Sequence, residues 1–238
     1  MDNLKKSFKS LKWYEIIMIV IMIVIAGMSI YEAIVHPETS SNPLWLTIIN
    51  FISAICGILC VFFCAKASIS NFVFATVNTI VYAIFLYYQK IYGTFALEVL
   101  FYLPVNFISW YIWAKHRDKK YVEKTKSKRL TLTQNIITTL AIVIGGIVYH
   151  YILVRIGGEV AWLDAFTLSI GIIAVILEML RYKEQYIWWI ITDVIAVAMY
   201  IMHFDPVYLT KKSIYLVMAV IGLINWTKLN KERNKANE

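Results

Sequence analysis

Long apolar runs without charge, divided by short charged segments, constrain this chain more than any other feature. No Asp, Glu, Lys or Arg occurs from position 39 to 65, or from position 130 to 154. A helix of about 20 apolar residues spans the hydrocarbon core of a bilayer, so each run is long enough to cross it. Only 16% of the residues are charged, whereas a soluble domain has about 25%. The sequence therefore predicts an all-α integral membrane protein.

Eight transmembrane helices fit between the charged segments. They are predicted at residues 13–35, within 39–65, and at 71–88, 94–114, 130–154, 162–180, 186–202 and 213–226, with a loop at 203–212. The first run exceeds the apolar part of a signal peptide, about 7–15 residues, and is interpreted as an uncleaved span. The predicted organisation is a basic segment with an extra helix (1–36), a three-helix unit (43–114), a basic loop (115–129), a linking helix (130–155), a second three-helix unit (160–228) and a charged tail (229–238).

The basic residues fix the expected orientation. They cluster at the N-terminus, in the loop at 115–129 and at the C-terminus. Eight spans bring all three clusters to one side, which the positive-inside rule assigns to the cytoplasm. The net charge of +8 is thus explained by membrane topology. We expect the lipid bilayer as a partner and both termini in the cytoplasm, and we do not expect a nucleic acid partner.

A polar stripe interrupts the fourth apolar run. Glu98, Tyr102, Asn106 and Trp110 recur every four residues, so a helix places them near one face. Pro104 lies among them and removes a backbone hydrogen bond, which predicts a bend. Polar groups at bilayer depth are costly and mark functional sites by default. We predict that this stripe faces a small-molecule substrate. The alternatives are a bond to a neighbouring helix for Asn106, the interfacial aromatic belt for Trp110 and contact with interfacial water for Glu98.

Other polar and aromatic residues extend the predicted substrate site. Trp189 and Asp193 share a face of the seventh span, and an indole can stack on a planar ring while a carboxylate can bind hydroxyls or a cation. The remaining candidates are Asn78, Tyr82 and Gln89 in and after the third span, and Trp188 and Tyr200 in the seventh span. For Asp193, Asn78, Tyr82 and Gln89, hydrogen bonding between helices is the alternative role.

An internal repeat is suggested by a shared frame of aromatic residues. Tyr92 lies 18 residues before Trp110, and Tyr208 lies 18 residues before Trp226, each followed two positions later by a threonine. We therefore predict two parallel three-helix units joined by the fifth span. Parallel repeats related by an axis along the membrane normal occur in transporters that bind substrate between the halves.

This arrangement resembles the PnuC family of bacterial vitamin and nucleoside transporters. The resemblance rests on Trp189-Ile-Ile-Thr-Asp193 in the seventh span and on Pro104-Val-Asn106 with Trp110 in the fourth, and covers residues 40 to 228. The adjacent pair Trp188-Trp189 departs from the family pattern. The resemblance implies a SWEET-like fold in the bacterial inner membrane. It also implies facilitated diffusion of nicotinamide riboside by alternating access and trapping of the substrate by a cytoplasmic kinase.

Several alternatives stay open. The same fold could carry another nucleoside such as a deoxyribonucleoside, thiamine or riboflavin, and a membrane receptor or structural subunit is a more remote reading. An intramembrane enzyme would need Asp193 or Glu98 as a base, but no phosphate loop, HExxH motif or nucleophile elbow is present. We therefore predict no enzyme activity and no catalytic residue. Homo-oligomerisation is left open.

The three cysteines do not predict a cofactor. Cys56, Cys60 and Cys64 are spaced by four residues on one span, which could suit a soft metal ion. No histidine or carboxylate lies near them in the sequence, and small polarizable side chains are common in helix packing. We expect them to pack between helices, with no metal site and no cofactor.

Overall fold

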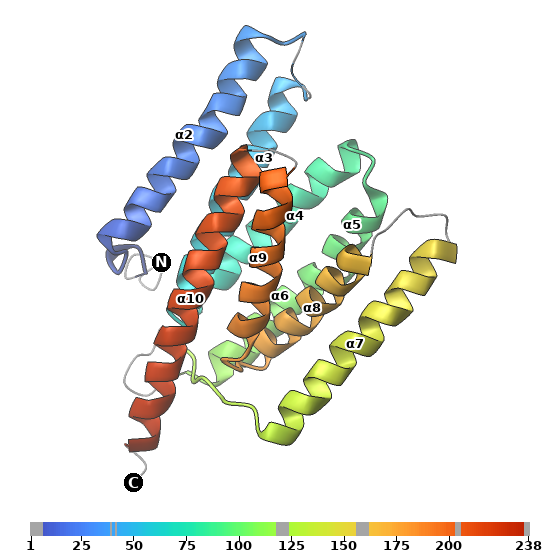
Figure 1. The fold of residues 1–238 in the computed structure, drawn as a ribbon. Coiled ribbons are helices and arrows are strands. Elements are labelled where there is room, and N and C mark those ends of the chain that lie inside the picture. Colours follow the sequence, from blue (N-terminus) through green and yellow to red (C-terminus); the bar gives the residue numbers. More distant parts are fainter. Residues whose placement is uncertain are drawn as a thin grey trace.

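The structure, a computed structural model, describes residues 7–38, 40, 42–117, 124–155, 162–202 and 206–235, and its elements are helices. These are α2 (Trp13–Val35), α3 (Leu44–Ala65), α4 (Asn71–Tyr88), α5 (Tyr92–Leu97), the π-helix η1 (Glu98–Tyr102), α6 (Leu103–Lys115), α7 (Leu132–Arg155), α8 (Trp162–Met179), α9 (Gln185–Met202) and α10 (Pro206–Lys235) (Figure 1). Because α5, η1 and α6 follow one another without a break, they form one long helix. Within the described ranges, seven helices are long and apolar enough to cross a membrane, and the apolar part of α8, Ala165–Met179, is shorter. The prediction of an all-α multi-pass membrane protein is confirmed.

The last helix begins earlier than predicted. The loop predicted at 203–212 is wrong from residue 206 onward, because α10 begins at Pro206. A proline ring fixes φ at a value that suits the first turn of a helix, where the missing N–H costs nothing. Lys211 and Lys212 therefore lie on a helix. The helix also continues to Lys235, through most of the segment predicted as a charged tail.

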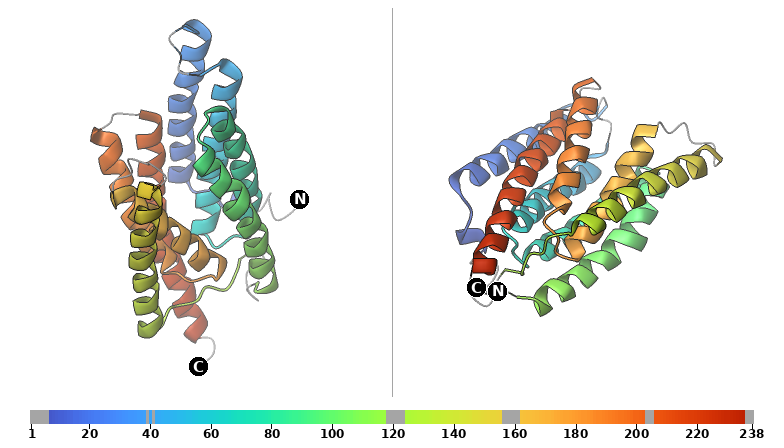
Figure 2. Two further views of the ribbon diagram at one scale, coloured as in Figure 1. Left: turned by 90° about the vertical axis from the view of Figure 1, so that its right-hand side faces the viewer. Right: turned by 60° about the horizontal axis from the view of Figure 1, so that its bottom comes forward.

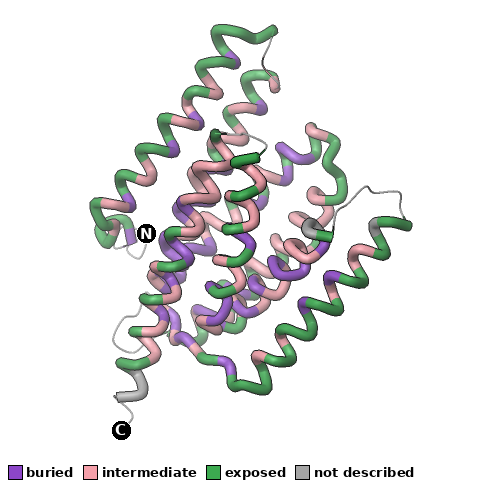
Figure 3. Tube along the Cα trace, in the orientation of Figure 1, coloured by how far each residue is buried: buried purple, intermediate pink, exposed green. Residues whose placement is uncertain are grey.

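Six helical segments form a closed ring. Each packs against the next in the order α3, α4, α6, α8, α9 and α10, and α10 packs back against α3. Outside the ring, α2 packs on α3 and α10, and α7 packs on α8 (Figures 1 and 2). Exposed residues dominate α2 and α7, whereas buried residues gather on the ring (Figure 3). The exposed apolar surface is the face expected toward lipid.

The bundle has a basic end and an opposite end. The basic end holds the start of α2, the two turns at 66–70 and 180–184, the described parts of the loop at 115–131 and the end of α10. Ala67 and Arg181, one in each turn, have positive φ values of 56° and 69°. Thr125 donates its N–H to the Ala67 carbonyl at 2.9 Å, and Lys128 donates to the Arg181 carbonyl at 2.7 Å. The loop is therefore fixed to both turns.

Two tryptophans close the ring at the basic end. Trp113 on α6 donates its Nε1–H to the Glu178 carbonyl at 2.9 Å, and Trp226 on α10 donates to the Cys64 carbonyl at 3.0 Å. Both indoles are fully buried, and their ring centroids lie 5.4 Å apart. Buried indoles with paired N–H groups contribute large apolar contact without an unsatisfied donor.

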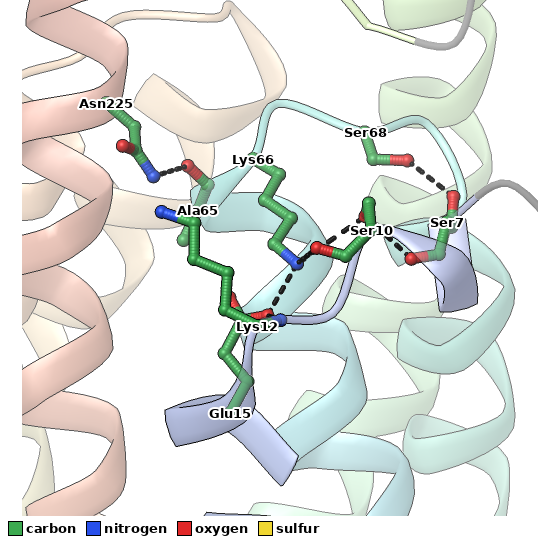
Figure 4. Close-up of polar contacts among 8 residues, drawn as sticks. All are labelled: Ser7, Ser10, Lys12, Glu15, Ala65, Lys66, Ser68 and Asn225. Carbon is green, nitrogen blue, oxygen red and sulfur yellow. Dashed lines mark hydrogen bonds and ion pairs between the residues drawn. The ribbon is translucent and has the colours of Figure 1, made fainter.

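The N-terminal segment is anchored to the same end (Figure 4). Lys66 Nζ lies 2.5 Å from Glu15 Oε2 and donates to the Ser10 carbonyl at 2.7 Å, and the hydroxyls of Ser7 and Ser68 are 3.1 Å apart. Burial lowers the pKa of the Lys66 amine, and the Glu15 carboxylate opposes that shift. Glu15 is buried, and its Oε2 accepts from Lys66 Nζ and from the N–H of Lys12. The contacts tie α2 to the turn after α3.

Candidate functional site

A cavity of about 400 Å³ lies inside the ring of helices. Its lining brings together most of the predicted substrate residues, namely Asn78, Tyr82, Glu98, Tyr102, Asn106, Trp189, Asp193 and Tyr200. They come from α4, from the helix formed by α5, η1 and α6, and from α9. Small-molecule sites have volumes of about 300–1,000 Å³ and combine apolar walls with a few polar groups. This cavity has that size and that composition.

Three predicted residues lie outside this cavity. Trp110 is 37% exposed and Trp188 is partly exposed, and neither is among the lining residues. Gln89 lies at the opposite end, where its Nε2 donates to Asn42 Oδ1. An α-helix turns by about 100° per residue, so a spacing of four overshoots each turn by about 40°. The stripe of four residues therefore drifts off its face by Trp110.

The π-helical turn explains how the first part of the stripe keeps its direction. In η1 the N–H of Leu103 bonds to the carbonyl of Glu98, five residues back. A π-helical turn holds one residue more than an α-helical turn. It directly precedes Pro104, which has no N–H to donate. Glu98 and Tyr102 consequently both line the cavity. The irregularity predicted at Pro104 thus appears in the turn before it.

Two asparagines each keep one end of the amide for a ligand. Asn106 Nδ2 donates to Thr79 Oγ1 at 3.2 Å, and Ser53 Oγ donates to Asn78 Oδ1 at 2.9 Å. Bonding between helices, the alternative role, is therefore present at both positions. Among the described residues, Asn106 Oδ1 and Asn78 Nδ2 have no hydrogen-bond partner. One acceptor and one donor are available on the cavity wall.

Tyrosine hydroxyls lie against glycines on opposite sides of the cavity. A Cβ placed on Gly57 of α3 would overlap the Tyr215 hydroxyl, and a Cβ on Gly171 of α8 would lie 3.8 Å from the Tyr102 hydroxyl. A glycine allows this close approach because it has no side chain. Gly57 therefore makes room for Tyr215 in the lining.

Charged side chains of both signs face the cavity. Lys212 Nζ lies 3.1 Å from Asp193 Oδ1, and the Asp193 side chain is only 4% exposed. Lys211 Nζ lies 5.7 Å from the ring centroid of Tyr82, within range of a cation–π contact. With Glu98 and Glu178, the lining holds three carboxyl groups and two ammonium groups. Carboxyl groups thus exceed ammonium groups by one.

Sequence reasoning missed several lining residues on α4, on α10 and at the basic end. They are Thr79, Glu178, Tyr186, Tyr208, Lys211, Lys212 and Tyr215, together with Cys60 and Cys64, which were assigned to packing. On α10 the signal was present, because Tyr208, Lys212 and Tyr215 follow helical spacing. It was overlooked because residues 203–212 were assigned to a loop. No group of three metal-binding side chains occurs within the described ranges.

A second cavity of about 400 Å³ adjoins the first toward the opposite end. Its polar lining comes from α2, the following loop, α3 and α10: Ser29, Glu32, Ser40, Asn42, Thr47, Asn50, Tyr208 and Lys211. Tyr208 and Lys211 line both cavities. We call this second space the outer pocket. The bond from Gln89 to Asn42 orders its rim.

Comparisons with known proteins identify the family to which the chain belongs. A match to the family described as nicotinamide mononucleotide transporter covers residues 47–228. The chain is 34% identical over 192 residues to the nicotinamide riboside transporter PnuC of Neisseria mucosa, covering 77% of this chain and 73% of that protein. It is 29% identical to the protein of the same name from Haemophilus influenzae, over 98% of both chains.

A solved structure extends the similarity to three dimensions. The crystal structure of the vitamin B3 transporter PnuC matches with a TM-score of 0.76 and 29% identity, over 98% of both chains. The family match covers more than half of this chain, and the relatives named above are transporters. The chain therefore belongs to the nicotinamide mononucleotide transporter family and is a membrane transporter, not an enzyme.

Proposed function

We propose that this protein carries nicotinamide riboside across the bacterial inner membrane by facilitated diffusion. The observation that carries the proposal is the composition of the central cavity. Its lining combines aromatic side chains and two amide groups with three carboxyl groups and two ammonium groups, so that carboxyl groups exceed ammonium groups by one. Nicotinamide riboside has a positively charged pyridinium ring, an amide and ribose hydroxyls. The ring suits Trp189 and the carboxyl groups, while the amide and hydroxyls suit Asn78 and Asn106.

The charge in the cavity separates the riboside from the mononucleotide. The family is described by the mononucleotide and the relatives by the riboside. A phosphate group would add about two negative charges at pH 7 to a cavity that already has more carboxyl than ammonium groups. We therefore infer that the riboside is the substrate. Thiamine is the second candidate, because it also carries a positively charged ring, whereas riboflavin and uncharged nucleosides do not use the extra carboxyl group.

We also propose the arrangement of two parallel three-helix units, with α8 crossing the membrane as an eighth span. The closed ring supports it, because α6 packs on α8 just as α10 packs on α3. Equivalent bonds support it as well, since Trp113 and Trp226 each donate to a carbonyl near the end of the first helix in the other unit. When the two units are aligned by these equivalent bonds, Trp113, rather than Trp110, is the counterpart of Trp226.

Alternating access follows from this arrangement in the proposal. The two buried tryptophans close the basic end, and the outer pocket leads from the opposite end to Tyr208 and Lys211 at the central cavity. By the positive-inside rule the basic end and both termini face the cytoplasm. Substrate would enter through the outer pocket and leave after the halves rock apart at the tryptophan pair. A cytoplasmic kinase that phosphorylates the substrate would then prevent its return.

Uptake by proteoliposomes tests this function. Labelled nicotinamide riboside should enter liposomes that contain the protein without ATP or an ion gradient, and excess unlabelled riboside should compete better than the mononucleotide, thiamine or thymidine. If thiamine alone were taken up, thiamine would replace nicotinamide riboside as the assigned substrate. If none of these compounds were taken up, the transport proposal would be refuted.

Two substitutions test the site itself. Trp189→Ala should weaken riboside binding roughly tenfold or more through lost stacking, and Asn106→Ala about threefold to tenfold through a lost hydrogen bond. Trp188→Ala is the matched control, because Trp188 lies next to Trp189 but outside the cavity. Isothermal calorimetry measures the affinities, and gel filtration checks that each variant is folded. Equal effects of Trp188→Ala and Trp189→Ala would contradict the assignment.

A further inference from the structure

A third cavity, of about 460 Å³, lies at the basic end between the loop, the start of α7, the turn before α9 and the end of α10. Four of its lining residues are basic: Lys128, Arg129, Lys183 and Lys231. The other lining residues are uncharged, namely Ser127, Gln134, Tyr182, Thr227 and Asn230. No carboxyl group of the described residues lines this basic pocket. A cluster of basic side chains around one cavity attracts anions.

Main-chain bonds hold the basic residues in place. Lys183 donates its N–H to the Lys128 carbonyl at 3.1 Å, while the N–H of Lys128 donates to Arg181 at 2.7 Å. Asn230 of α10 then donates to the same Lys128 carbonyl at 3.2 Å and accepts from Ser127 Oγ at 2.8 Å. Three segments distant in sequence are thus joined under the pocket. The positive-inside rule needs basic residues on this side, but it does not need them gathered around one cavity.

An apolar stripe continues from the pocket along α9. Ile187, Ile191 and Val194 follow one another at helical spacing on α9, which begins two residues after Lys183, and their exposed fractions are 44%, 37% and 50%. Exposed branched side chains on a membrane-spanning helix face the acyl chains of lipids. A free inorganic phosphate would use only the basic residues, whereas a phospholipid would use both the basic residues and the stripe.

We propose that this basic pocket binds the phosphate headgroup of an anionic phospholipid, whose acyl chain lies along Ile187, Ile191 and Val194. Basic pockets between helices on the cytoplasmic side are suited to such headgroups. The site spans the loop that connects the two halves and the first two turns of α9. A bound lipid therefore adds contacts between segments that are otherwise joined by a few hydrogen bonds. The proposal does not depend on which substrate is carried.

Native mass spectrometry of the detergent-solubilised protein tests the site. Wild-type protein should retain dioleoylphosphatidylglycerol in preference to dioleoylphosphatidylcholine. The triple variant Lys128→Gln, Lys183→Gln and Lys231→Gln should bind phosphatidylglycerol on the order of 100-fold more weakly, at roughly fivefold per lysine. Changing the same three residues to Arg should preserve binding, which separates loss of charge from loss of folding.

A charge-matched control and a phosphate arm complete the test. Changing Lys9, Lys115 and Lys228 to Gln removes the same charge from exposed positions outside the pocket and should leave phosphatidylglycerol binding within about twofold of wild type. Equal losses in the two Gln variants would overturn the pocket. If sodium phosphate raises the melting temperature as much as phosphatidylglycerol does, the contribution of the α9 stripe is refuted and a simple anion site remains.

Discussion

Replacing Lys212 by Met tests whether this lysine serves as the counter-ion of Asp193 in the central cavity when no substrate is bound. At an effective dielectric constant of about 20, two unit charges about 3 Å apart attract each other by roughly 5 kcal/mol. Desolvation of the pair offsets several kcal/mol of this attraction. Because the Asp193 side chain is 4% exposed, losing its partner leaves a buried charge. We expect Lys212→Met to lower the free energy of unfolding by about 2–3 kcal/mol.

The reverse substitution should cost less. In Asp193→Asn the remaining lysine side chain is 28% exposed and can turn its ammonium group toward water in the cavity. We expect a loss of roughly 1 kcal/mol. The double variant should recover most of the stability lost in Lys212→Met, because neither charge is then left alone. Melting temperatures in detergent measure all three, with Lys115→Met as a control at an exposed position.

For Lys212→Met, binding should change in the opposite sense to stability. A pyridinium cation can replace the ammonium group beside Asp193, so Lys212→Met should bind nicotinamide riboside more tightly, by about tenfold or more. Asp193→Asn should bind it more weakly. Weaker riboside binding by Lys212→Met would show that the lysine contacts the substrate directly. A melting temperature equal to wild type would refute the counter-ion role.

Two further predictions concern packing around the cavity. Gly57→Ala should destabilise the protein by about 1–3 kcal/mol, because the added Cβ overlaps the Tyr215 hydroxyl; Tyr215→Phe should restore the melting temperature, and Gly27→Ala, where nothing lies within 4 Å, is the control. Trp113→Phe should cost about 1–3 kcal/mol because a buried carbonyl loses its donor, whereas Trp110→Phe at a 37% exposed position should be nearly neutral. Equal effects of the two tryptophan changes would contradict the role of the buried pair.

Hydropathy was enough to predict the membrane class and most helix boundaries. Long uncharged runs have few structural alternatives, because a lipid-exposed backbone must satisfy its hydrogen bonds internally. The error at the start of α10 arose because Asp205-Pro206 and two lysines are typical of a loop. The structure places those lysines at a polar cavity inside the bundle. A sequence window averages over all sides of a helix and does not detect such a one-sided environment.

The candidate site could be predicted only in part for a similar reason. Asn106, Trp189 and Asp193 were recognisable because polar groups are costly at bilayer depth. Trp110 lies outside the central cavity, because a spacing of four residues only approximates the helical repeat. The π-helical turn η1, which sets the direction of Glu98 and Tyr102, is not visible in the sequence. The partner of Asp193 comes from another helix, and a single sequence does not indicate which helices meet.

The closed ring of helices has a consequence for biosynthesis. The helices up to α6 leave the ribosome first, and in the finished protein their cavity-facing residues Glu98, Tyr102 and Asn106 are enclosed partly by α8, α9 and α10. Until those helices are made, these side chains lack much of their protein environment, and each polar group left in lipid is costly. The nascent first half therefore depends on temporary shielding, by water in the insertion machinery or by a chaperone, until the second half is synthesised.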